Sequence, residues 1–223
     1  MKRLDTLKDK HPGSTIWVFG SGASVGYLSP RFFDGKICIA TNLIAQHFDL
    51  SAYYLFTHYH YNVLDNLANP GMMAAVTHDL CSSRWHPNQA NLPGEGCVKD
   101  DKQVIYNYLT DRTPKGDAFD PYVHAKTDEI VFGSSSIHGS MHLAAWMGAS
   151  NIVLVGADCG SIDGEHRVDE YPPGHQPWDL YNRHLMRMKA WLKENYSVEV
   201  YSLNPFVNYS LEGVQYRGFA SIN

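Results

Sequence analysis

The sequence has few charged residues and lacks a basic excess, which argues against one class of protein. Only 18% of its 223 residues are charged, and an excess of acidic residues gives a formal net charge of −5. Without a basic excess or a long basic run, binding to nucleic acid through the phosphate backbone is disfavoured. The four cysteines form no C-x-x-C pair. Cys38 and Cys159, in or beside expected strands, are most simply buried thiols.

Long apolar runs are also missing. No run approaches the roughly 20 apolar residues that a helix needs to cross a bilayer, so we expect no transmembrane segment. The first residues, MKRLDTLKDKHPG, are charged and lack the apolar stretch of a signal peptide. These two features predict a cytoplasmic protein with reduced thiols.

The chain does contain enough apolar material for a core. Apolar residues make up 44% of it, with 14 Tyr, 9 Phe and 5 Trp, which suits one domain over residues 1–223. Short apolar runs of the kind found in buried parallel strands recur between helical patterns. They predict an α/β fold: a single Rossmann-like domain with a doubly wound, mainly parallel sheet. The expected strands are Thr15–Phe19, Lys36–Ala40, Ala52–Phe56, Ala74–Thr77, Ile130–Phe132, Asn151–Val155 and Val198–Leu203.

Two long polar segments interrupt this pattern. Residues 81–125 are rich in Pro, Gly, Asn and charge, and they predict an insertion. Residues 160–178, which directly follow an expected strand, predict a lid loop, because long loops at the carboxyl ends of strands are often functional. An apolar face with helical spacing predicts a helix over Asp179–Asn195 between the second segment and the last strand.

A glycine-rich turn, GSGASVG, follows the first expected strand. Its pattern is G-x-G-x-x-x-G, which differs from the dinucleotide fingerprint, and a tight turn without a ligand is the alternative interpretation. A nicotinamide site also needs an acidic residue about 20 positions on, where this chain has Asn42. An oxidoreductase is therefore disfavoured, although an asparagine can bind a sugar or a phosphate. The candidate nucleotide-binding residues of the turn are Gly20, Ser21, Gly22 and Ser24.

A second small-residue turn lies at Ser134, Ser135 and Ser136, before a helix that is expected to reach Met147. Serine is a common N-cap, so capping alone is one interpretation. The other is a phosphate cradle made of hydroxyls and the free N–H groups of a helix N-terminus. Gly156 and Asp158 end the strand that follows this helix, and they are added to the candidate nucleotide-binding residues.

Histidines mark two further candidates. His58 and His60 have the H-x-H spacing of metal ligands but no evident third ligand, so we favour hydrogen-bonded wall residues and expect no metal site. His166, Arg167 and His175 lie in the expected lid loop, where a solvated polar loop is the alternative. Histidine suits proton transfer near neutral pH, and arginine can bind a phosphate with two hydrogen bonds.

The sequence resembles the bacterial sialyltransferases that use CMP-linked sialic acid, together with their wider superfamily. That group includes motility accessory factor glycosyltransferases and archaeal hydroxymethylpterin pyrophosphokinases. Residues 80–125 do not take part in the resemblance. The similar segments occur in the same order as VFGSGASVGYL, ICIATN, GSSSIHGSMHLAAWMGASNIVLVGAD and GHQPWDLYNRHLMRMKAWLKENYSVEVYSLNP.

The resemblance implies a metal-independent glycosyltransferase with a CMP-linked sugar donor as substrate and no cofactor. His175 matches the general base, and Asn42 and Ser135 match groups around the phosphate and the sugar. Two tyrosines that assist the departing phosphate in the family are replaced here, and His166 with Arg167 could serve instead. In the nucleotide pocket Ser21 replaces an asparagine, while the matching residues are Gly20, Gly22, Ser24 and Asp158.

Two other functions remain open. A pyrophosphokinase of the hydroxymethylpterin type would use ATP and Mg²⁺, but THYHYN stands where the archaeal enzymes carry an acidic cluster. A nucleotide-binding protein without catalysis is the other alternative. The acceptor would be a glycan or a small molecule. Tyr106, Tyr108 and Phe119 could contact either a sugar or a second subunit of a homo-oligomer.

Overall fold

The computed structural model describes residues 2–57, 71–78, 103–110, 122, 129–160 and 178–203. Most of the expected insertion and lid loop falls outside these residues. So do the candidate residues His58, His60, His166, Arg167 and His175.

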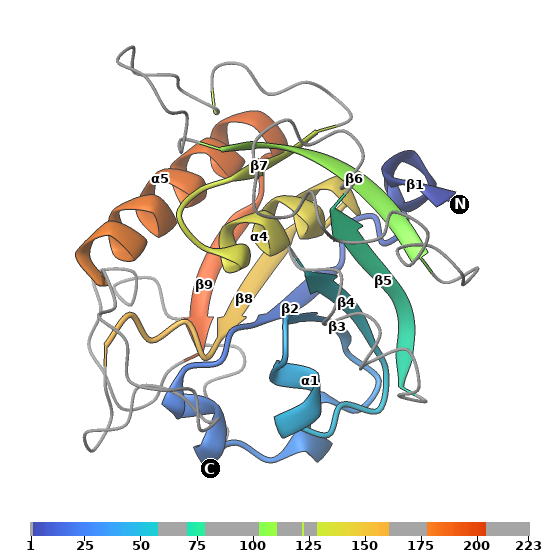
Figure 1. Cartoon of the computed structure of the whole chain (residues 1–223), viewed down its shortest axis with the longest axis vertical. Helices are drawn as coiled ribbons and strands as arrows, with labels where there is room; N and C mark the ends of the chain where they lie inside the picture. Colours follow the sequence, from blue (N-terminus) through green and yellow to red (C-terminus); the bar gives the residue numbers. More distant parts are fainter. Residues whose placement is uncertain are drawn as a thin grey trace, which may run out of the picture.

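A parallel sheet forms the centre of the described chain (Figure 1). Its strand order is β1-β6-β5-β4-β3-β2-β8-β9, with β7 paired to β6, and every pairing is parallel. Strand β6 pairs with β5 and β1 through its first half and with β7 through its second half. The strands are β1 (Lys2–Arg3), β2 (Thr15–Phe19), β3 (Ile37–Thr41), β4 (Tyr53–Thr57), β5 (Met72–His78), β6 (Gln103–Thr110), β7 (Glu129–Phe132), β8 (Asn151–Val155) and β9 (Glu199–Leu203).

The helices cover both faces of this sheet. The long helices are α4 (Ser136–Trp146) and α5 (Trp178–Tyr196), and the short ones are α1 (Ile44–His47) and the 3₁₀ helices η1 (Leu4–Leu7), η2 (Ala23–Tyr27) and η3 (Pro30–Phe33). Side chains of β2 alternate between two buried clusters, as they do along any strand. Ile16 and Val18 pack with residues of α4 and α5, whereas Trp17 and Phe19 pack with Phe33 of η3 and with α1. The predicted doubly wound α/β fold is therefore confirmed.

All seven expected strands are present, with ends that differ by about two residues or fewer. Sequence analysis assigned no strand to β6, which belongs to the sheet although it lies within residues 81–125. Its sequence, QVIYNYLT, is rich in apolar and aromatic residues. Polar segments flank it on both sides, and for this reason it was included in the expected insertion. Strand β1 has two residues, which is too short for any periodicity to be recognised.

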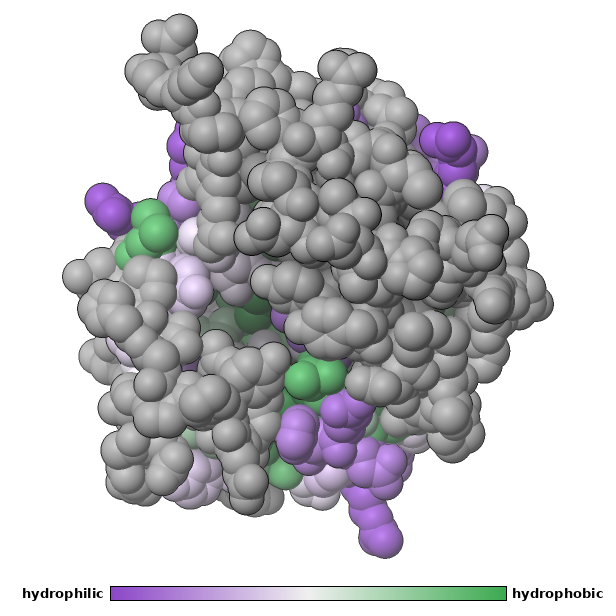
Figure 2. Space-filling model, in the orientation of Figure 1, coloured by the Kyte–Doolittle hydropathy of each residue, from purple (hydrophilic) through white to green (hydrophobic). Residues whose placement is uncertain are grey.

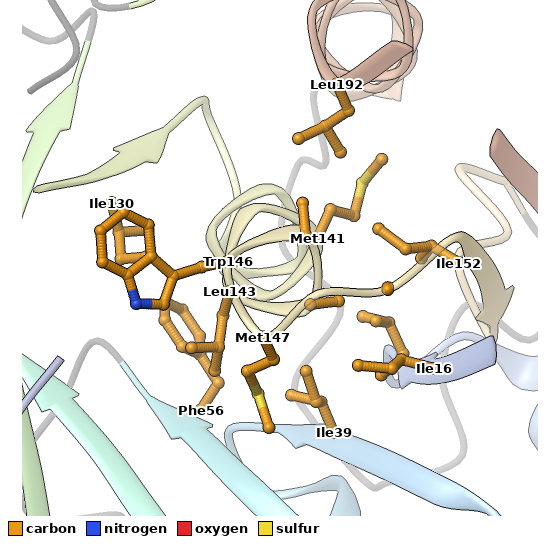
Figure 3. Close-up of a cluster of buried hydrophobic side chains, with 14 of the residues drawn as sticks. Ile16, Ile39, Phe56, Ile130, Met141, Leu143, Trp146, Met147, Ile152 and Leu192 are labelled. Carbon is orange, nitrogen blue, oxygen red and sulfur yellow. The ribbon is translucent and has the colours of Figure 1, made fainter. Parts of the chain in front are cut away.

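Helix α4 is buried between the sheet and α5 along nearly its whole length (Figure 3). Met141 and Leu143 of this helix lie among side chains from β2, β3 and α5. Gly139 allows the close approach, because a Cβ atom there would come 2.6 Å from ring atoms of Phe56 and Phe132. The sequence signal for this helix is consequently weak: its apolar residues are distributed all around it, as in other buried helices.

Within the described part of the chain, no helix combines the length and apolar character that a membrane crossing requires. On the face shown in Figure 2, described residues at the surface are largely hydrophilic, with a few small hydrophobic areas.

His142 joins α4 to both of its neighbours. Its Nδ1 accepts a hydrogen bond from the Val131 N–H of β7 at 2.8 Å, and its Nε2 lies 2.7 Å from the Tyr196 hydroxyl of α5. Burial lowers the pKa of this imidazole from its ordinary value of 6.5 to about 3. In the folded protein the ring is therefore a neutral acceptor at every pH above that value.

This burial makes the stability of the protein depend on pH. Between about pH 6.5 and pH 3 the unfolded chain binds a proton at His142 that the folded chain does not, so the free energy of unfolding falls as the pH is lowered. His142→Asn keeps an acceptor near Nδ1 but cannot titrate. The free energy of unfolding of this variant should therefore fall less steeply with decreasing pH than that of the wild type, by about 1.4 kcal/mol per pH unit, the value for one proton. Urea unfolding between about pH 6 and pH 4 measures this slope. An unchanged slope would show that His142 is not the titrating group.

Candidate functional site

The candidate residues that the structure describes lie at the edge of the sheet where the strand order reverses. From β2 the chain proceeds through β3, β4, β5 and β6 on one side and returns to β8 on the other. The switch point therefore lies between the carboxyl ends of β2 and β8, which is where open α/β sheets bind ligands. The glycine-rich turn follows β2, Asn42 follows β3, and Gly156–Asp158 follow β8.

The turns after β2 and β8 are in direct backbone contact. The Gly20 N–H donates to the Val155 carbonyl at 2.7 Å, and the Gly22 N–H donates to the Gly156 carbonyl at 2.8 Å. A Cβ atom at Gly20 would lie 2.5 Å from the Gly156 oxygen, and one at Gly22 would lie 2.5 Å from Cγ of Asp158. Since Cβ atoms do not approach so closely, these contacts require glycine at both positions. Gly156 itself has a φ of +65°, which side chains rarely adopt.

Asp158 joins the same two turns through its side chain. The Ser24 N–H donates to Oδ2 at 2.8 Å, and the Ser24 hydroxyl donates to Oδ1 at 2.5 Å. Both residues are buried. Burial raises the pKa of the Asp158 carboxyl, and the two hydrogen bonds from Ser24 act in the opposite direction. In the described structure Ser24 and Asp158 thus hold the turns together. The helix after the first turn is the 3₁₀ helix η2, which is too short to have a large dipole.

Asn42 has an unusual conformation and an unused acceptor. Its φ is +54°, in the left-handed region, and its N–H donates to the Phe56 carbonyl of β4 at 2.9 Å. Its Oδ1 is buried and accepts no hydrogen bond from the residues that the structure describes. The preceding residue, Thr41, is fixed to α4, since its hydroxyl lies 2.8 Å from that of Ser140. Most buried acceptors in folded proteins have a partner, so this oxygen is a candidate contact for a bound molecule.

The serine turn, Ser134–Ser136, begins α4 with Ser135 as the N-cap residue. The Ser135 N–H donates to Nδ1 of His138 at 3.1 Å, and the Ser134 N–H donates to Nδ1 of His184 at 2.9 Å. Two N–H groups that we expected to face a phosphate are therefore already engaged. Within the described residues no hydrogen bond engages the N–H groups of Ser136 and Ile137, which remain as donors for an anion.

Sequence reasoning did not assign a role to either imidazole. His138 follows Ser135 at the three-residue spacing of a capping box, a signal that could have been recognised. His184 lies 50 residues from its partner and gives no local signal. Burial, with a smaller effect from the neighbouring His184, lowers the pKa of His138 to about 3, and a backbone contact with Tyr181 opposes the shift.

Among the described residues, no group of three His, Cys, Asp or Glu side chains is placed to hold a metal ion.

No protein-family model matches the sequence, and no curated protein matches it. Among solved structures, the chain is similar in fold to the sialyltransferase CstII from Campylobacter jejuni, in complex with a substrate analogue, cytidine-5'-monophosphate. The TM-score is 0.53 at 15% sequence identity, and the match covers 92% of this chain and 84% of that chain. The sialyltransferase-like fold expected from the sequence is thereby supported. The resemblance to motility accessory factors and to pterin pyrophosphokinases stays a prediction.

Removing the Asp158 carboxylate should destabilise the switch point. Asp158→Ala leaves the buried hydroxyl and N–H of Ser24 without their acceptor, which costs about 1–3 kcal/mol. Asp158→Asn retains one acceptor oxygen and avoids the burial of a charge, so its loss should be smaller. Urea unfolding measures both variants. The exposed Asp34→Ala is the control, with an expected change within about 0.5 kcal/mol. Equal stability of Asp158→Ala and the wild type would contradict the role given to Asp158.

Proposed function

We propose that the protein is a glycosyltransferase that uses a CMP-linked sugar as donor and needs no metal ion. The observation that carries the proposal is the fold, which follows that of a CMP-bound sialyltransferase over 92% of this chain. The candidate residues lie at the carboxyl edge of the sheet, where such folds bind ligands. The unused acceptor of Asn42 supports the proposal, since a sugar hydroxyl or a nucleobase amine could donate to it.

The N-terminus of α4 suits the phosphate of such a donor. Its dipole and the N–H groups of Ser136 and Ile137 are favourable to an anion, and its first turn contains no acidic residue. In the proposed complex the phosphate lies at this N-terminus and Asn42 contacts the sugar. The glycine-rich turn borders the nucleotide.

The chemistry is assigned to residues outside the described structure, on the basis of the sequence resemblance. His175 takes the proton of the acceptor hydroxyl as its oxygen bonds to the anomeric carbon. The bond from that carbon to the phosphate oxygen breaks, and the phosphate leaves with the electron pair. His166 and Arg167 stabilise the charge that develops on it. General base catalysis would supply about 10²–10⁴ of the rate, and positioning and electrostatic stabilisation would supply the remainder.

A calorimetric comparison of nucleotides tests the proposed function. CMP, CDP, UDP and ATP are titrated into the protein with and without Mg²⁺. We expect CMP to bind without metal and more tightly than UDP, because the proposed pocket recognises cytidine. Binding of ATP that requires Mg²⁺ would instead favour the pyrophosphokinase. Metal-free CMP binding without CMP release from any CMP-sugar would favour a nucleotide-binding protein that is not an enzyme.

Replacing the proposed base should separate catalysis from binding. We expect His175→Ala to lower turnover at least about a hundredfold, because the acceptor hydroxyl is then not deprotonated. CMP affinity should remain nearly unchanged, as measured by calorimetry. The control is His11→Gln, at the amino ends of the strands. Nε2 of His11 lies 2.9 Å from the Tyr54 hydroxyl, and the amide of glutamine can make the same hydrogen bond. Turnover close to that of the wild type would eliminate His175 as the base.

A further inference from the structure

We infer that His184 of α5 is a positioning residue that fixes the serine turn so that the next two N–H groups of α4 receive the donor phosphate. This inference rests on the proposed function for its ligand and on the described contacts for its geometry. His184 belongs to neither of the turns that sequence analysis assigned to the nucleotide.

The contact between α5 and the serine turn is close. Nδ1 of His184 accepts the Ser134 N–H at 2.9 Å, and Nδ1 of His138 accepts the next N–H, that of Ser135, at 3.1 Å. The rings of the two histidines are edge to face, with centroids 5.9 Å apart. Gly133 lies against both of them, since a Cβ atom there would be 2.6 Å from Nδ1 of His138 and 3.2 Å from Nδ1 of His184. Any side chain at position 133 would displace the rings.

The helix that carries His184 is firmly anchored. Leu185, Met188 and Leu192 of α5 are almost fully buried and belong to the same cluster as the core-facing residues of α4. Leu192 lies over α4 in Figure 3. The position of the imidazole is therefore determined by the packing of two helices and not by the turn that it contacts. A positioning residue needs such independent support, because an acceptor carried by a loop would move together with that loop.

The charge of the acceptors explains why imidazoles suit this place. An aspartate, the common capping residue, would bring a negative charge to the N-terminus of α4 and would repel a phosphate. A neutral imidazole accepts the N–H without adding charge, so the positive end of the helix dipole is preserved. Burial keeps His138 in this neutral form, with a pKa of about 3. The anion is then left with Ser136 and Ile137 as backbone donors.

Two substitutions at one position separate the acceptor from the packing. His184→Leu removes the acceptor, whereas His184→Asn places an amide oxygen close to the position of Nδ1. Met186→Ala, at an exposed side chain on the same helix, is the matched control. Two properties are measured for each variant: amide hydrogen exchange at Ser134 and Ser135 in the free protein, and the affinities for CMP and for cytidine, which has no phosphate.

His184→Leu should accelerate exchange in the serine turn. It should also weaken CMP binding about tenfold, because ordering the turn on binding would then cost about as much as the one hydrogen bond that no longer fixes it. Its affinity for cytidine should stay within about twofold of the wild type, since the nucleoside does not contact the turn. His184→Asn should restore both slow exchange and CMP affinity. A purely structural role would lower the affinities for CMP and cytidine together.

The other possible results would each contradict a specific part of this inference. Equal losses for CMP and cytidine, unchanged CMP affinity in His184→Leu, or no recovery in His184→Asn would each refute the positioning role. If the wild type binds none of the nucleotides, the proposed function fails together with the phosphate part of this inference. Slow exchange in His184→Leu would refute the role of His184 in fixing the turn, whether or not a nucleotide binds.

Discussion

The carboxyl edge of the sheet depends on how closely α4 packs against β4 and β7. Gly139 permits that approach, because the rings of Phe56 and Phe132 occupy the space where any side chain would stand. At the next residue of the helix, the Ser140 hydroxyl lies 2.8 Å from that of Thr41, and this contact fixes the strand end before Asn42. The same packing places the start of α4 beside the candidate residues. A shift of this helix would therefore displace the serine turn and the end of β3 together.

The switch point between β2 and β8 is held in a similar way, by backbone contacts that leave no space for side chains. Gly20 and Gly22 donate to carbonyls of the β8 end, and the contact between Ser24 and Asp158 fixes the same two turns from the side. The crevice expected at a switch point is filled at its base by the protein itself. In the proposed complex the ligand therefore lies above these glycines, near the end of β3 and the start of α4.

Much of this arrangement could be predicted from sequence, because it is encoded locally. The ends of β2 and β8 agree with the expected strands, and the α5 helix was evident from its apolar face. The glycine-rich turn, Asn42 and Gly156 each follow an expected strand, and the carboxyl ends of parallel strands meet at one edge of the sheet. Partners distant in sequence could not be found in this way. Nothing near Ser24 indicates that Asp158 will accept both of its hydrogen bonds, and nothing near Ser134 indicates His184.

The chain from β7 into α4 shows why those distant partners matter. Among the described residues β7 pairs with β6 alone, so no second strand accepts the N–H group of Val131. Nδ1 of His142 accepts the N–H group of Val131 in its place. In the turn that follows β7, Nδ1 of His184 and Nδ1 of His138 accept the N–H groups of Ser134 and Ser135. Two of these rings come from α4 and one from α5. The turn before α4 is therefore defined by helix side chains, and its geometry follows from the packing of α4 and α5 against each other.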